Sequence, residues 1–322
     1  MADIDPAAPP SYPPPPLQPR RTHTWVWVIG GAVFVFLILF IGLLTIGMLA
    51  MRHGDQDAVE GSGAGGRVGV IELEGVILST QDFEDNVKRY FDDDSVKAII
   101  IRINSPGGGA AASQEIYSEI RHLKQEHKKP IVSSIETVGA SGAYYVASAT
   151  DKIYANNASV VGSIGVIAEW VNYGDLMKWA KLKSQVLTAG ALKDAGDPAR
   201  DMTPQERAYL QSIVDDLYGQ FVRDVAVGRH TTPEAIKPLA TGQVWTGEQA
   251  VPLKLIDGIG TFREVVEKTG QQVGLGKNPT LMHPAKHKRS IFDLLFGDAS
   301  DLLPDAARNM RTQLGFYYLW GR

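Results

Sequence analysis

A long uncharged segment near the N-terminus constrains this chain more than any other feature. Residues 25–51 contain no Asp, Glu, Lys or Arg. As a helix, at about 1.5 Å per residue, this segment would span a hydrocarbon core about 30 Å thick. Trp25 and Trp27 suit the membrane interface at its near end. A cleaved signal peptide has a shorter apolar core of roughly 7–15 residues. The sequence therefore predicts an uncleaved single-pass transmembrane anchor over 25–51.

Basic residues near this segment predict its orientation. Arg20 and Arg21 precede it, whereas Arg52 alone follows before a stretch that contains Asp55 and Asp57. Cytoplasmic flanks carry the excess of Lys and Arg. We therefore expect a cytoplasmic N-terminus, with the rest of the chain on the extracytoplasmic side of a bacterial inner (cell) membrane.

Composition divides the chain into further segments. Residues 1–22 are rich in proline and lack an apolar period, which predicts a disordered tail. Residues 52–66 are glycine-rich and predict a flexible linker. A folded domain is expected over 67–275. The C-terminal tail, 276–322, ends in an aromatic run, and packing on the domain, on a neighbouring molecule or on the membrane surface all stay open, with protein favoured.

Within the folded domain, apolar strand signals alternate with helical patterns. Strands are predicted at 68–73, 98–103 and 131–135, and helices at 86–91 and 111–124. This alternation is typical of βαβ units around a largely parallel sheet, so the expected fold class is α/β.

The second half of the domain is more helical. Thr203, Pro204 and Glu206 form a capping box with proline in the first turn, which predicts a helix start. Apolar residues then recur at helical spacing from Leu210 to Val225. This pattern indicates that one face of the helix is buried in the core or in a subunit interface. The pattern Thr246-Gly247-Glu248-Gln249 predicts a second, shorter capped helix.

Charge and composition exclude several classes of function. The net charge is -4 and no basic stripe occurs, so nucleic acid is not an expected partner. The chain has no cysteine, which excludes disulfides, thiol nucleophiles and cysteine-ligated zinc. No His-Glu-x-x-His pattern occurs, and we expect neither a metal nor a cofactor.

The strongest candidate for chemistry is Ser141. It follows the apolar segment 131–135 and precedes a second apolar segment, 143–149, that could form a buried helix. At a strand-to-helix turn, a serine hydroxyl is exposed and placed for nucleophilic attack, and the N-terminus of the helix lies beneath it. The alternative is that Ser141 only caps that helix, a role that serine performs well.

A serine nucleophile needs a base to remove its proton. None of the seven histidines lies at the end of an apolar strand. Lys193, in a small-residue loop that follows a predicted strand end, is the remaining candidate. A lysine acts as a base only when it is neutral, which requires desolvation. The alternative is a surface lysine paired with Asp194.

Two glycine-rich turns could complete such a site. Residues 104–109 read Asn-Ser-Pro-Gly-Gly-Gly, and backbone N–H groups there could stabilise an oxyanion or bind a phosphate. The Gly-x-Gly-x-x-Gly spacing occurs only at 61–66, in the predicted linker, and is discounted. Ser163, in a second small-residue turn, could hold the base by a hydrogen bond or could be an ordinary turn residue.

Together these motifs resemble the signal peptide peptidase A (protease IV) family in its short, single-repeat form. The resemblance rests on Ser-Pro-Gly-Gly at 105–108, Ala-Ser-Gly-Ala-Tyr-Tyr at 140–145, Gly-Ser-Ile-Gly-Val at 162–166 and Lys-Asp at 193–194. The later segments 245–250 and 256–260 are also similar, and the motifs keep the family's order over residues 67–270. Leu192 stands where the family often has an aromatic residue before its lysine.

The resemblance implies a serine/lysine dyad on a Clp-protease/crotonase-like fold built of ββα-type superhelical repeats. Ser141 would be the nucleophile and Lys193 the general base, oriented by Ser163. Backbone N–H groups of Gly108 and Gly142 would form the oxyanion hole. Single-copy members form rings in which subunits complete the dyad, so a homo-oligomer is implied. The implied reaction is endopeptidase cleavage of remnant signal peptides and other apolar peptides at the membrane.

Two other functions compete with this one. A crotonase-like enzyme acting on acyl-CoA thioesters would keep the fold, but the anchor and the Ser/Lys pair argue against it. A non-catalytic oligomeric membrane scaffold would use the proline-rich tail to recruit partners, but a pseudo-enzyme would often have lost the serine or the lysine.

Overall fold

The computed structural model describes residues 29–31, 33–42, 45, 58–60, 65–284 and 315–320. The chain divides into two compact units, Met1–Asp55 and Gln56–Arg322, and each is described by itself. In the first unit, the described residues between 29 and 45 are helical. Among all the described residues, no helix has both the length and the apolar character needed to span a membrane. The predicted proline-rich tail, 1–22, lies outside the described residues.

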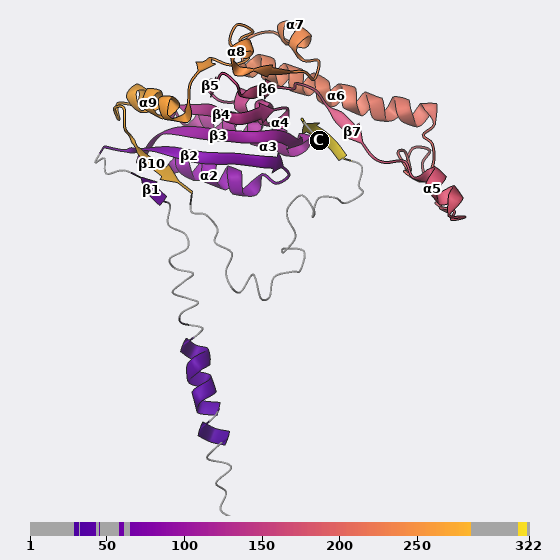
Figure 1. Cartoon of the computed structure of the whole chain (residues 1–322), viewed down its shortest axis with the longest axis horizontal. Helices are drawn as coiled ribbons and strands as arrows, with labels where there is room; N and C mark the ends of the chain where they lie inside the picture. Colours follow the sequence, from indigo (N-terminus) through magenta and orange to yellow (C-terminus); the bar gives the residue numbers. More distant parts are fainter. Residues whose placement is uncertain are drawn as a thin grey trace, which may run out of the picture. The chain divides into compact units, whose positions relative to one another are not determined.

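The second unit is built on one mixed sheet, which confirms the predicted α/β class (Figure 1). The strand order is β1-β10-β2-β3-β4-β5-β9, with β6, β7, β8 and β11 paired off this path. The strands are β1 (Ala58–Glu60), β2 (Arg67–Ile77), β3 (Val96–Gly109), β4 (Ile131–Ala140), β5 (Lys152–Ala155), β6 (Val160–Gly162), β7 (Ile167–Glu169), β8 (Val244–Thr246), β9 (Gly258–Ile259), β10 (Thr280–His283) and β11 (Gly315–Leu319). The central strands β2, β3, β4 and β5 are parallel, as predicted.

Helices connect these strands and cover the sheet. They are α2 (Gln81–Asp92), α3 (Ala110–Glu126), α4 (Gly142–Ser148), α5 (Gly174–Trp179), α6 (Pro204–Gly228), α7 (Pro233–Ile236), the 3-10 helix η1 (Lys237–Leu239), α8 (Gly247–Ala250) and α9 (Phe262–Gln272). The predicted capping boxes are confirmed at the starts of α6 and α8. The helix predicted at 86–91 begins five residues earlier, at Gln81, and contains acidic residues in its first turn.

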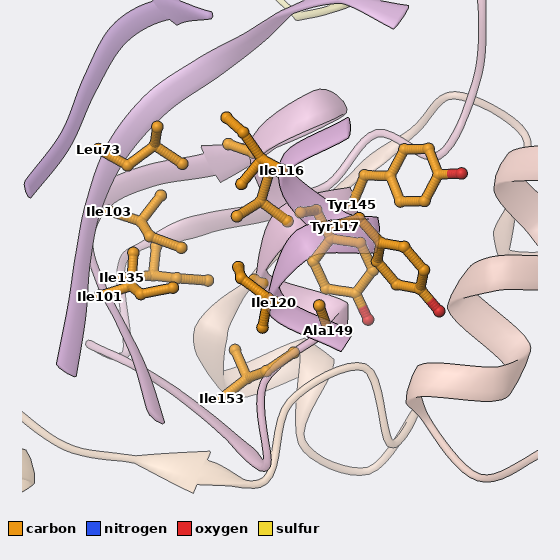
Figure 2. Close-up of a cluster of buried hydrophobic side chains, with 14 of the residues drawn as sticks. Leu73, Ile101, Ile103, Ile116, Tyr117, Ile120, Ile135, Tyr145, Ala149 and Ile153 are labelled. Atoms are coloured by element: carbon orange, nitrogen blue, oxygen red, sulfur yellow. The ribbon is translucent and has the colours of Figure 1, made fainter. Parts of the chain in front are cut away.

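The central strands bury side chains on both faces, which explains their continuous apolar sequence. Ile101 and Ile103 of β3 pack in the larger core with residues of α3 and α4 (Figure 2). Residues of α2 belong to the same core. Ile100, on the opposite face, packs with Val265 and Val266 of α9. Because successive residues of a strand point to opposite faces, the run of isoleucines serves both layers.

Strands β3 and β4 are longer than the sequence predicts. β3 continues to Gly109 and β4 to Ala140, so the glycine-rich segment expected as a turn at 104–109 is paired strand. Gly107 and Gly108 of β3 pair with Val76 and Ile77 of β2. Glycine is a poor strand former on its own. Pairing with the neighbouring strands therefore makes this segment a strand although its local sequence does not favour one.

Candidate active site

Ser141 stands between β4 and α4, as predicted, in an uncommon backbone conformation. Its φ of 55° and ψ of -119° are strained for a residue with a side chain, at a cost of order 1–3 kcal/mol. Its N–H donates to the carbonyl of Gly162 at 2.7 Å, and its carbonyl accepts from the N–H of Tyr145 at 2.9 Å. Its side chain makes no capping hydrogen bond, so the helix-cap alternative is wrong.

The helix that follows Ser141 is buried over its whole length and is held by two tyrosines. The Tyr144 hydroxyl donates to the carbonyl of Leu255 at 2.7 Å. The Tyr145 hydroxyl donates to the carboxylate of Asp224, and its ring stacks on Phe221 with centroids 4.6 Å apart. Burial raises the pKa of both phenols, so each stays a neutral hydrogen-bond donor. These contacts fix α4 and hence the position of Ser141.

The two predicted oxyanion-hole residues come together beside Ser141. A Cβ atom placed on Gly142 would lie 3.1 Å from the backbone nitrogen of Gly108 and 2.3 Å from Oγ of Ser113. Ser113 is itself fixed, because its hydroxyl donates to the carbonyl of Gly109 at 2.9 Å. Only glycine therefore fits at 142, and its backbone lies against that of Gly108. Adjacent backbone N–H groups of this kind can stabilise the charge of a tetrahedral intermediate.

Ser141 and Ser163 line one cavity of about 410 Å³. Ser163 also has positive φ, 51°, and its N–H donates to the carbonyl of Gln243 at 2.8 Å. Val214 and Tyr218 of α6 contribute one wall of the cavity. None of the described residues that line it is Lys, Arg or His. The described lining residues thus supply a serine pair and one carboxylate, Asp215, but no lysine or histidine, to this cavity.

Lys193 lies elsewhere, in an exposed series of turns before α6. It is not among the cavity-lining residues. Its predicted alternative, pairing with Asp194, does not occur: the Asp194 carboxylate pairs with Arg200 at 2.9 Å. Arg200 also binds Glu206 at the start of α6 and, with the N–H of Thr203, lowers the pKa of Glu206 to about 2. The ion pairs therefore tie the Lys193 turn to α6.

The segment that contains Lys193, residues 170–202, is called the arm below. Its two ends are joined, because the N–H of Tyr173 donates to the carbonyl of Pro198 at 2.8 Å. The arm exposes an unusual number of large apolar side chains, including Trp179 at 81% and Leu187 at 102% of full exposure. The others are Val171, Tyr173, Leu176, Leu182 and Val186. Such a surface indicates an interaction site.

The C-terminal tail, whose packing partner the sequence leaves open, packs on the domain. β11 pairs antiparallel with Gly107–Gly109 of β3 and with Ile167–Glu169 of β7. Leu319 and Trp320 then line the cavity that contains Ser141. The available signal was the aromatic run at 316–320, but nothing local to that run specifies its partner strands. Among the described residues, no cluster of three or more His, Cys, Asp or Glu is placed to hold a metal ion.

Comparison with known proteins gives consistent results. The sequence model of peptidase family S49 matches residues 123–276. The Synechocystis protein named "Putative protease slr0021" is 32% identical over 237 residues, which cover 73% of this chain and 85% of that protein. Protease 4 of Haemophilus influenzae is 31% identical over 226 residues, covering 67% of this chain and 36% of that protein. The "Putative signal peptide peptidase SppA" of Enterococcus faecium is 35% identical over 187 residues, 58% of this chain and 54% of the relative.

Proposed function

This chain belongs to the signal peptide peptidase A family of S49 peptidases, and on that premise we propose that it is a membrane-anchored serine endopeptidase. Its proposed catalytic pair is Ser141 and Lys193. Its proposed substrates are cleaved signal peptides and other apolar peptides at the membrane. The observation that carries the proposal is the strained, buried serine between β4 and α4, beside two glycine backbones.

In the proposed reaction, Oγ of Ser141 attacks the scissile carbonyl while the neutral amine of Lys193 accepts the hydroxyl proton. The N–H groups of Gly108 and Gly142 donate to the oxyanion. The protonated lysine then gives its proton to the leaving amine, and an acyl-enzyme remains. Water, deprotonated by the same lysine, hydrolyses the ester and releases Ser141. Ser163, which shares the cavity, would orient the lysine by a hydrogen bond.

We propose that a second copy of the chain supplies the lysine. The cavity at Ser141 has no basic side chain among its described lining residues, while Lys193 is exposed on the arm. The apolar side chains of the arm would become buried against a neighbour. That burial would also remove water from Lys193, which favours the neutral amine that a base requires. Repetition of this head-to-tail contact would close a ring.

We propose a Clp-protease/crotonase-like fold, supported by the family match and the mixed sheet. We also propose that residues 25–51 anchor the chain in the bacterial inner membrane with the N-terminus in the cytoplasm. The uncharged sequence of that segment and its flanking arginines support this placement.

The test compares peptide hydrolysis by the full chain, purified in detergent, with its Ser141→Ala and Lys193→Ala variants. A synthetic signal peptide and short apolar peptides serve as substrates. Because the proposed pair acts as a unit, each variant should lose at least about a thousandfold in turnover. The matched control is Lys183→Ala, which removes another exposed lysine of the arm and should retain parental activity.

Two outcomes would contradict the proposal. Full activity in Lys193→Ala would exclude the dyad, and full activity in Ser141→Ala would exclude the nucleophile. Turnover of acyl-CoA thioesters by a chain that does not hydrolyse peptides would favour the crotonase-like alternative.

A further inference from the structure

One side of α6 forms a wall of the cavity that contains Ser141. Val214, Asp215 and Tyr218 contribute to this wall, and they lie on one side of the helix because residues four apart are neighbours on its surface. Among the described residues that line the cavity, Asp215 is the only one with a charged side chain. A single negative charge therefore faces an otherwise uncharged set of lining residues.

The carboxylate of Asp215 is oriented by its own helix. Nε2 of Gln211, one turn earlier, donates to Oδ1 of Asp215 at 2.8 Å. A carboxylate accepts hydrogen bonds at both oxygens, so this contact fixes the group and leaves Oδ2 with acceptor capacity for a ligand. Within the part of the chain that the structure describes, none of the ion pairs involves Asp215. Its charge is therefore available to a cation from outside that part of the chain.

The surroundings of Asp215 suit a long basic side chain. Asp215 is exposed, whereas Ser141 is buried, so the carboxylate lies at the solvent edge of the cavity. Val166, Ile167 and Val214 supply apolar lining. Lysine and arginine bury their aliphatic stems against apolar surface and keep the charged head in a polar environment. A basic side chain of a bound peptide can thus contact the apolar lining and reach Asp215 with its head.

The lysine that is proposed to complete the site is a poorer partner for this carboxylate. A negative charge beside a lysine favours the charged ammonium, whereas Lys193 must be neutral to act as a base. The neutral hydroxyl of Ser163 can orient that lysine without this penalty. A cation that belongs to the substrate has no such conflict, so substrate binding is the better assignment for Asp215.

We propose that Asp215 is a specificity-determining residue, which binds a lysine or arginine side chain of the peptide whose scissile bond lies at Ser141. The inference deepens the proposed peptidase function and rests on it. Signal peptides carry a basic segment next to an apolar one, so a single substrate offers a cation to Asp215 and apolar side chains to the cavity. Acidic side chains are disfavoured at the same position because like charges repel.

Binding of matched peptides tests this proposal. The probes are hexapeptides of alanine and leucine, capped at both ends and labelled with the neutral fluorophore BODIPY. One position carries lysine, norleucine or glutamate, and that position is scanned along the peptide. Norleucine keeps the aliphatic stem of lysine but has no charge. All chains are full-length in nonionic detergent and contain Ser141→Ala, which prevents hydrolysis, and affinity is measured by fluorescence polarisation.

The expected preference is for lysine at one position of the scan. There, the chain with Asp215 intact should bind the lysine probe about fivefold more tightly than the norleucine probe, and at least about tenfold more tightly than the glutamate probe. Asp215→Asn, which keeps the shape of the side chain, should reduce both ratios below about twofold. Asp215→Lys should invert the preference between lysine and glutamate. High salt should shrink the preference of the intact chain, because the pair is exposed.

The matched control is the next residue of the helix. Asp216 is also exposed, and its Oδ2 accepts from Nε2 of Gln220 at 2.8 Å, but Asp216 is not among the residues that line the cavity. Asp216→Asn and Asp216→Lys should keep the ratios of the intact chain within about twofold. Equal effects of the Asp215 and Asp216 variants would overturn the proposal, because the preference would then come from the general charge of α6. Unchanged ratios in Asp215→Asn, or no binding of any probe, would also overturn it.

Hydrolysis separates this inference from the proposed function. In chains with Ser141 intact, Asp215→Asn should not displace the pH profile of kcat/KM for the norleucine peptide. A displaced profile would overturn the inference, because Asp215 would then act on the base and not on the substrate. Charge-selective binding through Asp215 in a chain that hydrolyses no peptide would disprove the peptidase function and leave the basic subsite standing. Hydrolysis without any dependence on Asp215 would do the reverse.

Discussion

The two residues of the proposed catalytic pair lie in regions of opposite character. Ser141 is 1% exposed, and the helix after it is buried at every residue. Lys193 is exposed on the arm, where apolar side chains such as Trp179 face solvent. The serine is positioned by the core of its own chain. The arm forms ion pairs at its base but leaves its apolar side chains uncovered.

The contrast indicates how the site would be assembled. Tyr144 and Tyr145 hold the nucleophile in place before any partner arrives. Only contact with another chain would bury the apolar side chains of the arm and remove water from Lys193. Under this proposal, folding prepares one half of the site and assembly adds the other.

The largest expected effect comes from mixing two inactive variants. If the pair forms between subunits, oligomers that contain both Ser141→Ala and Lys193→Ala chains regain sites in which an intact serine meets an intact lysine. Random mixing in equal amounts should restore about a quarter of the parental activity. Peptide hydrolysis is measured after co-refolding or co-expression. Mixed oligomers that stay inactive, although each variant assembles normally, would place both residues in one subunit or exclude the dyad.

Core and arm should differ in their contribution to folding. Ile101→Ala removes a fully buried side chain of β3 and should lower the free energy of unfolding by about 2–5 kcal/mol. Leu187→Ala, in the arm, removes a fully exposed side chain and should change it by less than about 0.5 kcal/mol. Denaturant titration of the dissociated chain measures both. A large loss in Leu187→Ala would show that the arm packs on its own chain.

The hydrogen bond that holds α4 should have a smaller effect. Tyr144→Phe leaves the buried Leu255 carbonyl without its donor, which should cost about 1–3 kcal/mol. We expect lower stability together with slower peptide hydrolysis, because α4 positions Ser141. Tyr209→Phe, at an exposed tyrosine of α6, is the control and should leave both properties unchanged. Unaltered stability in Tyr144→Phe would show that this hydrogen bond does not hold α4 in place.

The smallest effect concerns the ion pairs at the base of the arm. Arg200 holds the pKa of Glu206 at about 2, below its ordinary value of 4.5. A carboxylate with a lowered pKa stabilises the folded state fully above its unfolded pKa, and this contribution is lost as the pH falls from about 4.5 towards 2. The stability advantage of the parent over Glu206→Gln should therefore shrink across that range, as measured by thermal unfolding.

The matched control is Glu248→Gln, which removes an exposed carboxylate in the first turn of α8. It should track the parent through the same pH range. An advantage over Glu206→Gln that stays constant down to pH 2 would mean that the Arg200 contact does not act through the charge of Glu206.

Much of the fold could be predicted from local patterns. The β-branched run near Ile101 predicts a buried strand, and the Thr203 and Thr246 capping boxes predict two helix starts, because these signals act within a few residues. The ends of β3 and β4 could not be predicted. Their glycine-rich segments are strands only because β2, β6 and β11 pair with them.

Local sequence patterns specify a serine between a strand and a helix, glycines beside it, a lysine in a small-residue loop, and an uncharged segment near the N-terminus. The tertiary structure then determines which of these residues come into contact. It brought Gly108 to Gly142, placed Ser163 in the cavity of Ser141, left Lys193 in solvent, and laid Tyr318 between α4 and α6. Such contacts join residues that are distant in sequence, and they are selected by burial and strand pairing over the whole domain.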